Sequence, residues 1–384
     1  MRPFRVEVSD AALEDLQRRL RGHRPLRFPL DDPELGIDVA VLEDVVAHWR
    51  DGFDWRAIER ELNRFDHVLV EVDGLDVHAV HARADGPNPL PLVIGHGWPS
   101  TFAEVLPAID LLTRPGDFGG DPADAFDVVI PSLTGYAWSA PPRILSDVTA
   151  ARMGDRWHGL MRALGYERYG ASGGDIGARV VAWMGAQVPD SIVGLHVSCN
   201  AISPPEPDHG ASLTPEERAW IARDASWWEL EGGYEHIQRT KPRTVAIALD
   251  DSPVGTAAWV IEKWSSWAQT GGDPVAKFGL DQLLTHVMLH WTAGSMGTSV
   301  LTYAAFRLPP GPRPPAGAVT APVGVYVSEA EPHGIPPRSF AERQYDVARW
   351  SVIPRGGHFL PAEEPELFAR DVREFFRPLR AERS

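Results

Sequence analysis

Short apolar runs that alternate with helix-forming stretches most strongly limit what this chain can fold into. The runs PLVIGHG, FDVVIPS and ERYGASG stand in the middle of the chain, and PVGVYVS and RWSVIP stand near its carboxyl end. Strands that are apolar throughout are buried on both faces, as in a parallel sheet covered by helices. The sequence therefore predicts an α/β fold with a mostly parallel sheet and a final helix at PELFARDVREFF.

Two helical segments accompany this predicted core. Helical periodicity covers the first segment, which starts after a capping Ser9, and a hairpin around Asp73 follows it. The second segment holds seven of the 14 tryptophans and ends at the proline-rich linker LPPGPRPPAGA. For a chain of 384 residues we therefore expect a helical arm at 1–65, core at 66–200, a helical lid at 201–307 and core at 308–384.

Composition and charge narrow the classes of partner. Hydrophobic residues make up 43% and charged residues 23% of the chain, as in folded globular proteins. The formal charge of −16 argues against nucleic acids and anionic membranes, and favours a neutral or cationic small molecule. Cys199 is the one cysteine, so an intramolecular disulfide cannot form, and we expect this side chain in the core. No apolar run reaches the ~18 residues of a membrane span, and we expect a cytoplasmic protein without a signal peptide.

The segment GASGGDIGAR, residues 170–179, follows one apolar run and precedes a helix. A sharp strand-to-helix turn rich in small residues is typical of the nucleophile elbow of α/β-hydrolases. Two registers fit this elbow: Gly-x-Ser-x-Gly makes Ser172 the nucleophile, whereas Gly-x-Asp-x-Gly makes it Asp175. A third interpretation is that Asp175 merely caps the helix. These residues alone leave the three interpretations open.

Two further motifs favour a hydrolase. His96-Gly97-Trp98-Pro99 follows an apolar run and matches a loop that supplies a backbone donor to an oxyanion hole. The donors would be the N–H groups of Trp98 and Ile176. Near the carboxyl end, Gly-Gly-His358-Phe follows a short strand, and this histidine comes last in the order nucleophile, acid, histidine. His358 is therefore a candidate general base.

Several motifs together resemble the microsomal-type epoxide hydrolases, and the resemblance covers nearly the whole chain, including the amino-terminal arm. The motifs are HGWP at 96–99, PSLTGY at 131–136, GGD at 173–175, GYEHIQ at 233–238, DSPVG at 251–255 and RGGHF at 355–359. The resemblance implies that Asp175, rather than Ser172, is the nucleophile. It also implies a triad acid at Glu331, although Glu329 competes for that role.

The same resemblance implies a reaction in two steps. Asp175 attacks an epoxide carbon while the lid tyrosines Tyr234 and Tyr303 polarise the ring oxygen. Water activated by His358 and Glu331 then hydrolyses the resulting ester to a vicinal diol, and no cofactor or metal is needed. Expected substrate-binding residues are Trp98, Pro99, Ile176, Tyr234 and Tyr303.

The tryptophan-rich lid suggests an apolar or aromatic epoxide. Both detoxification and natural-product biosynthesis are open roles, and a homodimer is compatible with the sequence. Ile176 departs from the family, in which a tryptophan often follows the nucleophile, so the pocket wall should differ.

Three rival functions are a carboxylic-ester hydrolase using Ser172, a haloalkane dehalogenase and a non-catalytic binding protein. A zinc site at His286-x-x-x-His290 is disfavoured, because Val287 stands where a metalloprotease has its glutamate.

Overall fold

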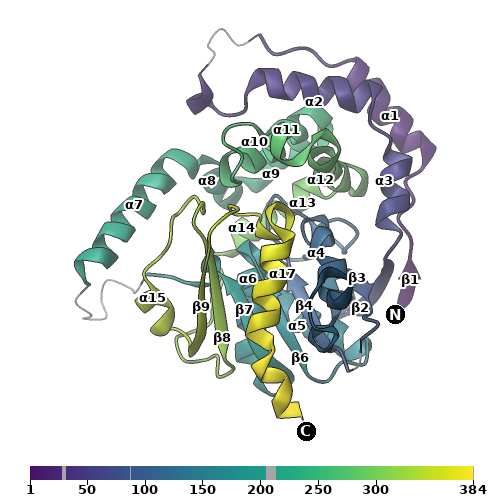
Figure 1. Ribbon diagram of the computed structural model, residues 1–384. Coiled ribbons are helices and arrows are strands. Elements are labelled where there is room, and N and C mark those ends of the chain that lie inside the picture. Colours follow the sequence, from purple (N-terminus) through teal and green to yellow (C-terminus); the bar gives the residue numbers. More distant parts are fainter. Residues whose placement is uncertain (28–31, 87, 205–212, 384) are drawn as a thin grey trace.

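A computed structural model of the chain describes residues 1–27, 32–86, 88–204 and 213–383, and within them it contains a nine-stranded sheet (Figure 1). The strand order is β1-β2-β3-β5-β4-β6-β7-β8-β9. The strands are β1 (Arg2–Phe4), β2 (Asp66–Val72), β3 (Leu75–Ala82), β4 (Leu90–Gly95), β5 (Phe126–Pro131), β6 (Tyr169–Gly173), β7 (Ile192–Ser198), β8 (Val323–Ser328) and β9 (Val347–Ile353).

The predicted, mostly parallel sheet is confirmed. Strands β5, β4, β6, β7, β8 and β9 pair in parallel, and β1, β2, β3 and β5 pair antiparallel. The hairpin of β2 and β3 turns at Asp73 and Gly74, which both have positive φ. Gly95 at the end of β4 is in register with Gly173 at the end of β6. The loops that follow these two strands therefore start side by side at the carboxyl edge of the sheet.

Helices cover both faces of the sheet. α4 packs against α17 on one face, and α5 packs against α6 on the other (Figure 1). The last helix is amphipathic, and it buries Phe368, Val372, Phe375 and Phe376 against the sheet. The core helices are α4 (Leu106–Thr113), α5 (Ala150–Ala163), α6 (Asp175–Gln187), α15 (Arg338–Glu342), α16 (Leu360–Glu363) and α17 (Pro365–Phe376).

The amino-terminal segment is helical after its first residues. It contains α1 (Asp10–Arg21), α2 (Val39–Asp51) and α3 (Trp55–Leu62), and the Ser9 hydroxyl caps α1 by accepting the Ala12 N–H at 3.3 Å. The sequence did not predict β1, because three residues are too few to show a strand period. This short strand extends the sheet at its edge by pairing with β2.

A set of helices between β7 and β8 lies over the carboxyl ends of the strands, and α1 and α2 lie over these helices in turn (Figure 1). Trp49 of α2 donates its indole N–H to the sulfur of Met288 at 3.2 Å, so the two helical segments share packing. We keep the division into arm, core and lid as a proposal. The lid helices are α7 (Pro215–Glu231), α8 (Gly233–Thr240), α9 (Pro242–Asp251), α10 (Pro253–Trp267), α11 (Pro274–Phe278), α12 (Leu280–Ala293), α13 (Met296–Ser299) and α14 (Leu301–Ala305).

Short 3-10 turns join several of these elements. They are η1 (Pro33–Leu35), η2 (Phe102–Glu104), η3 (Pro115–Phe118), η4 (Pro122–Asp124), η5 (Leu145–Val148), η6 (Pro189–Ser191), η7 (Cys199–Ala201) and η8 (Pro378–Arg383). Cys199, which was expected in the core, is only partly buried, because it lies in η7 where β7 leaves the sheet. Across the described ranges, every helix is too short or too polar to traverse a bilayer.

Candidate active site

Asp175 stands at a strained turn between β6 and α6. It is the first residue of the helix, and its φ of 46° lies in the left-handed region that is unfavourable for a residue with a side chain. The preceding Gly174 is the N-cap residue and makes no side-chain capping bond, so Asp175 does not cap the helix. The capping interpretation is therefore wrong, and the turn has the geometry of a nucleophile elbow.

Close backbone approach explains why small residues surround this elbow. A Cβ added at Gly97 would lie 2.2 Å from Oδ1 of Asp175, and one added at Gly177 would lie 2.5 Å from the carbonyl carbon of Gly95. Real side chains do not tolerate such distances. The loop after β4 and the start of α6 can therefore meet only because these positions are glycines.

The loop after β4 presents a backbone donor to Asp175. The N–H of Trp98 donates to Oδ1 of Asp175 at 3.0 Å. The N–H of Ile176 lies in the first turn of α6, where backbone donors have no acceptor within the helix. His290 holds the loop from the lid side, since its Nε2 is 3.0 Å from the Pro99 carbonyl oxygen. Of the two N–H groups expected to form the oxyanion hole, that of Trp98 thus contacts the Asp175 carboxylate, and that of Ile176 follows Asp175 at the start of α6.

His358 lies between two carboxylates. Its Nδ1 is 3.0 Å from Oε1 of Glu331, and its Nε2 is 3.6 Å from Oδ2 of Asp175. Nε2 is buried and has no hydrogen-bond partner among the described residues. Glu331 is only 6% exposed, whereas Glu329 is an exposed residue. The acid in contact with the histidine is therefore Glu331.

These contacts shift the pKa values of both partners. Burial lowers the pKa of His358, but the charge and hydrogen bond of Glu331 and the charge of Asp175 outweigh burial, so this pKa is well above its usual range. Burial raises the pKa of Asp175, but His358, Arg179 and the Trp98 N–H outweigh it, so this pKa is lowered. The site therefore favours an ionised Asp175 beside a protonated His358.

Two lid tyrosines face the same region. The ring of Tyr234, from α8, stacks on Trp98 with a centroid distance of 5.1 Å and an interplanar angle of 4°. Tyr303, from α14, meets the Tyr234 ring edge-on at 5.7 Å. Burial is the largest cause that raises the pKa of each phenol. Both hydroxyls therefore stay protonated and can donate hydrogen bonds.

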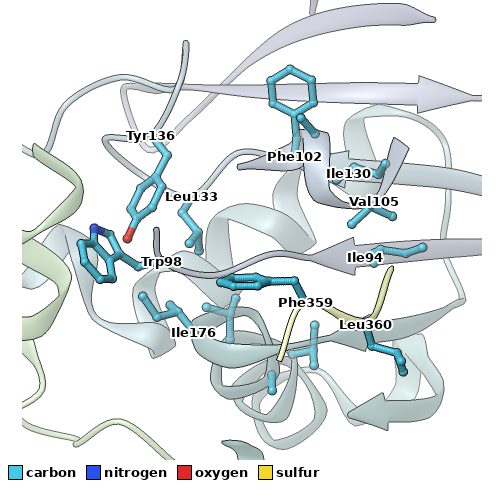
Figure 2. Close-up of a cluster of buried hydrophobic side chains, with 14 of the residues drawn as sticks. Ile94, Trp98, Phe102, Val105, Ile130, Leu133, Tyr136, Ile176, Phe359 and Leu360 are labelled. Carbon is cyan, nitrogen blue, oxygen red and sulfur yellow. The ribbon is translucent and has the colours of Figure 1, made fainter. Parts of the chain in front are cut away.

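A cavity of about 110 Å³ brings most of the predicted residues together. Trp98 and Pro99 are not among its lining residues. The Trp98 ring stacks on Tyr234 and belongs to a buried cluster, which Figure 2 shows together with Ile176 and Phe359. The lining residues are Asp175, Ile176, Arg179, Asn200, Trp227, Trp228, Tyr234, Glu235, Trp267, Tyr303, Phe306, Pro332, His333 and His358.

Sequence reasoning missed several of these residues, among them Arg179, Asn200 and His333. They come from separate elements: Arg179 ends the elbow segment 170–179, whereas Asn200 and His333 belong to no motif. Arg179 could have been found, because it lies four positions after Asp175 and so on the same face of α6.

Ser172 belongs to a different network, which does not line the cavity. Its hydroxyl is 3.1 Å from Nδ1 of His196, and Nε2 of His196 is 3.0 Å from Oδ2 of Asp371. Asp371 also accepts hydrogen bonds from Arg349 and Ser351. Ser172 and His196 are completely buried, and neither lines the Asp175 cavity. This Ser–His–Asp chain has the residue types of a catalytic triad but no access to a substrate.

His286 and His290 are buried structural residues. His286 stacks on Trp264 at a centroid distance of 4.2 Å, and His290 contacts Pro99 and Ser295. Within the described ranges, no group of three or more His, Cys, Asp or Glu side chains could hold a metal ion. Burial lowers the pKa of His286 to about 3 and the pKa of His290 to about 4.

We expect these histidines to make the fold sensitive to acid. His96, whose pKa burial also lowers to about 4, is a third such group. In the unfolded chain each has a pKa of about 6.5, so between pH 6.5 and about 4 the unfolded state binds more protons. We expect the free energy of unfolding to fall by up to about 1.4 kcal/mol per pH unit for each histidine as the pH drops through this range. Denaturant unfolding at pH 7, 6 and 5 measures the slope.

A matched pair of variants separates buried from exposed histidines. His286→Phe should reduce the slope, because the ring that must be protonated is gone. His236→Gln should leave it unchanged, because His236 is exposed. A stability that does not change between pH 7 and pH 5 would contradict the prediction.

Comparison with known proteins identifies the family and the fold of the chain. Residues 1–105 match the family model for the epoxide hydrolase N terminus, and residues 91–231 match the model for the alpha/beta hydrolase fold. The chain is 34% identical to epoxide hydrolase 1 of Sus scrofa over 98% of its own length and 88% of that protein.

Two solved structures are similar over nearly their whole length. Juvenile hormone epoxide hydrolase from the silkworm Bombyx mori superposes with a TM-score of 0.88 and 28% identity, over 100% of this chain and 95% of that chain. Aspergillus niger epoxide hydrolase superposes with a TM-score of 0.84 and 26% identity, over 98% and 96%.

The fold thus defines an α/β-hydrolase, and Asp175 stands at its strand-to-helix elbow. With its matched amino-terminal segment and its full-length relative, the chain belongs to the epoxide hydrolase family and is an enzyme of that class. The family resemblance and the α/β-hydrolase fold expected from the sequence are both confirmed.

Proposed function

We propose that this enzyme hydrolyses an epoxide to a vicinal diol through an ester on Asp175. The observation that carries the proposal is that the Asp175 carboxylate, the His358 imidazole and the hydroxyl-bearing rings of Tyr234 and Tyr303 line one cavity. A carboxylate nucleophile, a base and two weak acids are the groups that this chemistry needs.

The first step forms one bond and breaks one. An Asp175 oxygen attacks a ring carbon, the bond between that carbon and the ring oxygen breaks, and the electron pair stays on oxygen. Tyr234 and Tyr303 stabilise this developing alkoxide by hydrogen bonding and then by proton transfer. Their raised pKa values keep them protonated until charge appears on the ring oxygen.

Forming the ester prepares the second step. The Asp175 charge disappears when the carboxylate is alkylated, so one of the two charges that raise the pKa of His358 is lost. The pKa of His358 falls, so the imidazolium releases its proton, which replaces the proton that the tyrosine gave to the alkoxide. The neutral imidazole then takes a proton from water, and Glu331 stabilises the resulting imidazolium. Hydroxide attacks the ester carbonyl while the N–H groups of Trp98 and Ile176 hold the oxyanion; the bond to the diol oxygen then breaks, this oxygen takes the proton from His358, and the Asp175 carboxyl returns its proton to the imidazole.

The indoles of Trp227, Trp228 and Trp267 line the cavity and favour an aromatic or otherwise apolar epoxide. Detoxification and natural-product biosynthesis would use the same chemistry. Cytoplasmic location and a homodimer stay predictions.

The tyrosine pair provides the test. Tyr234→Phe and Tyr303→Phe should each slow ring opening of styrene oxide by about 10- to 100-fold, and the double variant by more, because general acid catalysis contributes on the order of 10²–10⁴. Single-turnover kinetics with diol and ester detection measures the step.

Tyr345→Phe is the matched control. This phenol is buried but bonds to the Ala201 carbonyl oxygen, away from the cavity. Ring opening that is unchanged in the double variant would contradict the proposal, as would hydrolysis of p-nitrophenyl acetate but of no epoxide.

A further inference from the structure

A second cavity adjoins the one that holds Asp175. Its volume is about 90 Å³, and it shares four lining residues with the first cavity. The shared residues are Arg179, Asn200, Trp228 and His333. The cavity that contains the nucleophile therefore continues past Arg179 toward the start of the lid and the linker after it.

Arg179 lies at the junction of the two cavities. Its guanidinium carbon is 4.5 Å from the centroid of the Phe306 ring, which supports one face of the side chain. Its Nε is buried and has no hydrogen-bond acceptor among the described residues. Within the same part of the chain, Arg179 is in no ion pair with a carboxylate. A cation that could accept an anionic partner thus stands one helical turn from the nucleophile.

A second arginine lines the far cavity. Arg313 donates from Nε and Nη2 to the backbone carbonyl oxygen of Asn200, at 3.2 and 3.0 Å. This contact orients the guanidinium without neutralising it, and no carboxylate among the described residues forms an ion pair with it. Burial, together with the charge of Arg179, lowers the pKa of Arg313 to about 9, and the charge of Asp224 is among the influences that oppose this shift. Arg179 and Arg313 both line the second cavity.

The carboxylates along the two cavities, in contrast, already have basic partners. Asp224 is 2.7 Å from Nδ1 of His333, and Glu235 is 3.6 Å from Nε of Arg239. Asp175 faces His358. Each carboxylate along the route thus has a basic neighbour, whereas neither Arg179 nor Arg313 forms an ion pair among the described residues. A buried guanidinium without an ion-pair partner favours an anionic group on the substrate.

We propose that the substrate is an epoxide that carries a carboxylate on the side away from the ring, and that Arg179 and Arg313 bind this carboxylate. The inference rests on the proposed function, because it places the epoxide at Asp175. A carboxylate fits better than a phosphate, since a planar group with one charge matches the guanidinium fork and is less costly to bury than a dianion. Arg179 and Arg313 are thus specificity-determining residues.

The test compares two substrates that differ only in this charge. They are 4-(oxiran-2-yl)benzoate and its methyl ester, and diol formation is followed by chromatography. We expect the wild-type enzyme to have a kcat/KM at least about 10-fold higher for the carboxylate, and the preference to shrink with added salt. Arg179→Met and Arg313→Met should each lower the ratio of the two kcat/KM values by about 10- to 100-fold.

Arg338→Met is the matched control. Arg338 is an exposed arginine of α15 that pairs with Glu342, and its replacement changes the net charge equally without touching either cavity. The substrate ratio should stay at the wild-type value. Arg179→Lys should restore part of the preference, because the charge returns without the planar fork.

Different outcomes separate the two proposals. A wild-type enzyme that hydrolyses both epoxides equally well would overturn the carboxylate inference while leaving the proposed function intact. Equal losses for both substrates in the two methionine variants would also overturn it, because Arg179 would then act on Asp175 rather than on the substrate. Failure to open either epoxide, or styrene oxide, would count against the proposed function itself.

Discussion

Replacing Asp175 by alanine is expected to lower epoxide turnover by on the order of 10⁴-fold or more, since loss of a nucleophile has effects of this size. The carboxylate has no substitute at the elbow, where its Oδ1 accepts the Trp98 N–H and its Oδ2 faces His358. Diol formation from styrene oxide measures the loss. Because Asp175 does not cap α6, the variant should stay folded, which circular dichroism checks.

Ser172→Ala is the control for this prediction. Ser172 is buried in contact with His196 and lines no part of the Asp175 cavity, so the variant should keep most of its activity. We expect only a loss of about 1 kcal/mol in the free energy of unfolding, from the missing hydrogen bond. The opposite pattern, with Ser172→Ala inactive and Asp175→Ala active, would make the enzyme a serine hydrolase.

The second large effect is expected for Glu331→Gln. Hydrolysis of the ester should slow by on the order of 10²–10⁴-fold, because an amide cannot stabilise the imidazolium that forms on His358 or select its tautomer. Ring opening depends less on this pair, so the ester should accumulate. Mass spectrometry of the quenched protein should then show the peptide that contains Asp175 with the mass of the epoxide added.

Glu329→Gln is the matched control, two residues away on the same loop. Glu329 is exposed, while Glu331 has its Oε1 3.0 Å from the histidine. The Glu329 variant should therefore turn over without detectable ester. Accumulation in Glu329→Gln alone would transfer the acid role to that residue.

The strand periods of the sequence predicted the core well. Apolar runs such as PLVIGHG and FDVVIPS correspond to β4 and β5. They could be recognised because a strand that is buried on both faces consists mainly of apolar residues. β1 was missed, since it consists of three residues whose pairing with β2 depends on a distant segment. Cys199 was placed in the core for its apolar character, but the end of β7 brings it to a cavity.

The candidate site was predictable where a residue belongs to a local motif. Asp175, Trp98 and His358 each follow a strand, and parallel strands bring the residues after their carboxyl ends to one edge of the sheet. Tyr234 and Tyr303 could be proposed only through the family resemblance, since a lid tyrosine by itself has no distinctive pattern. Arg313 carries no such pattern either, because it stands in a proline-rich linker.

The sequence alone was enough to establish the α/β class, the elbow and a short set of candidate residues, because each of these depends on local spacing. Tertiary structure was needed to choose between Glu329 and Glu331, since spacing admits both and only packing buries one of them against His358. It likewise separated Asp175 at the cavity from Ser172 in the core. The net charge of −16 could not show that Arg179 and Arg313 line the same cavity, because local charge depends on which side chains the tertiary structure brings together.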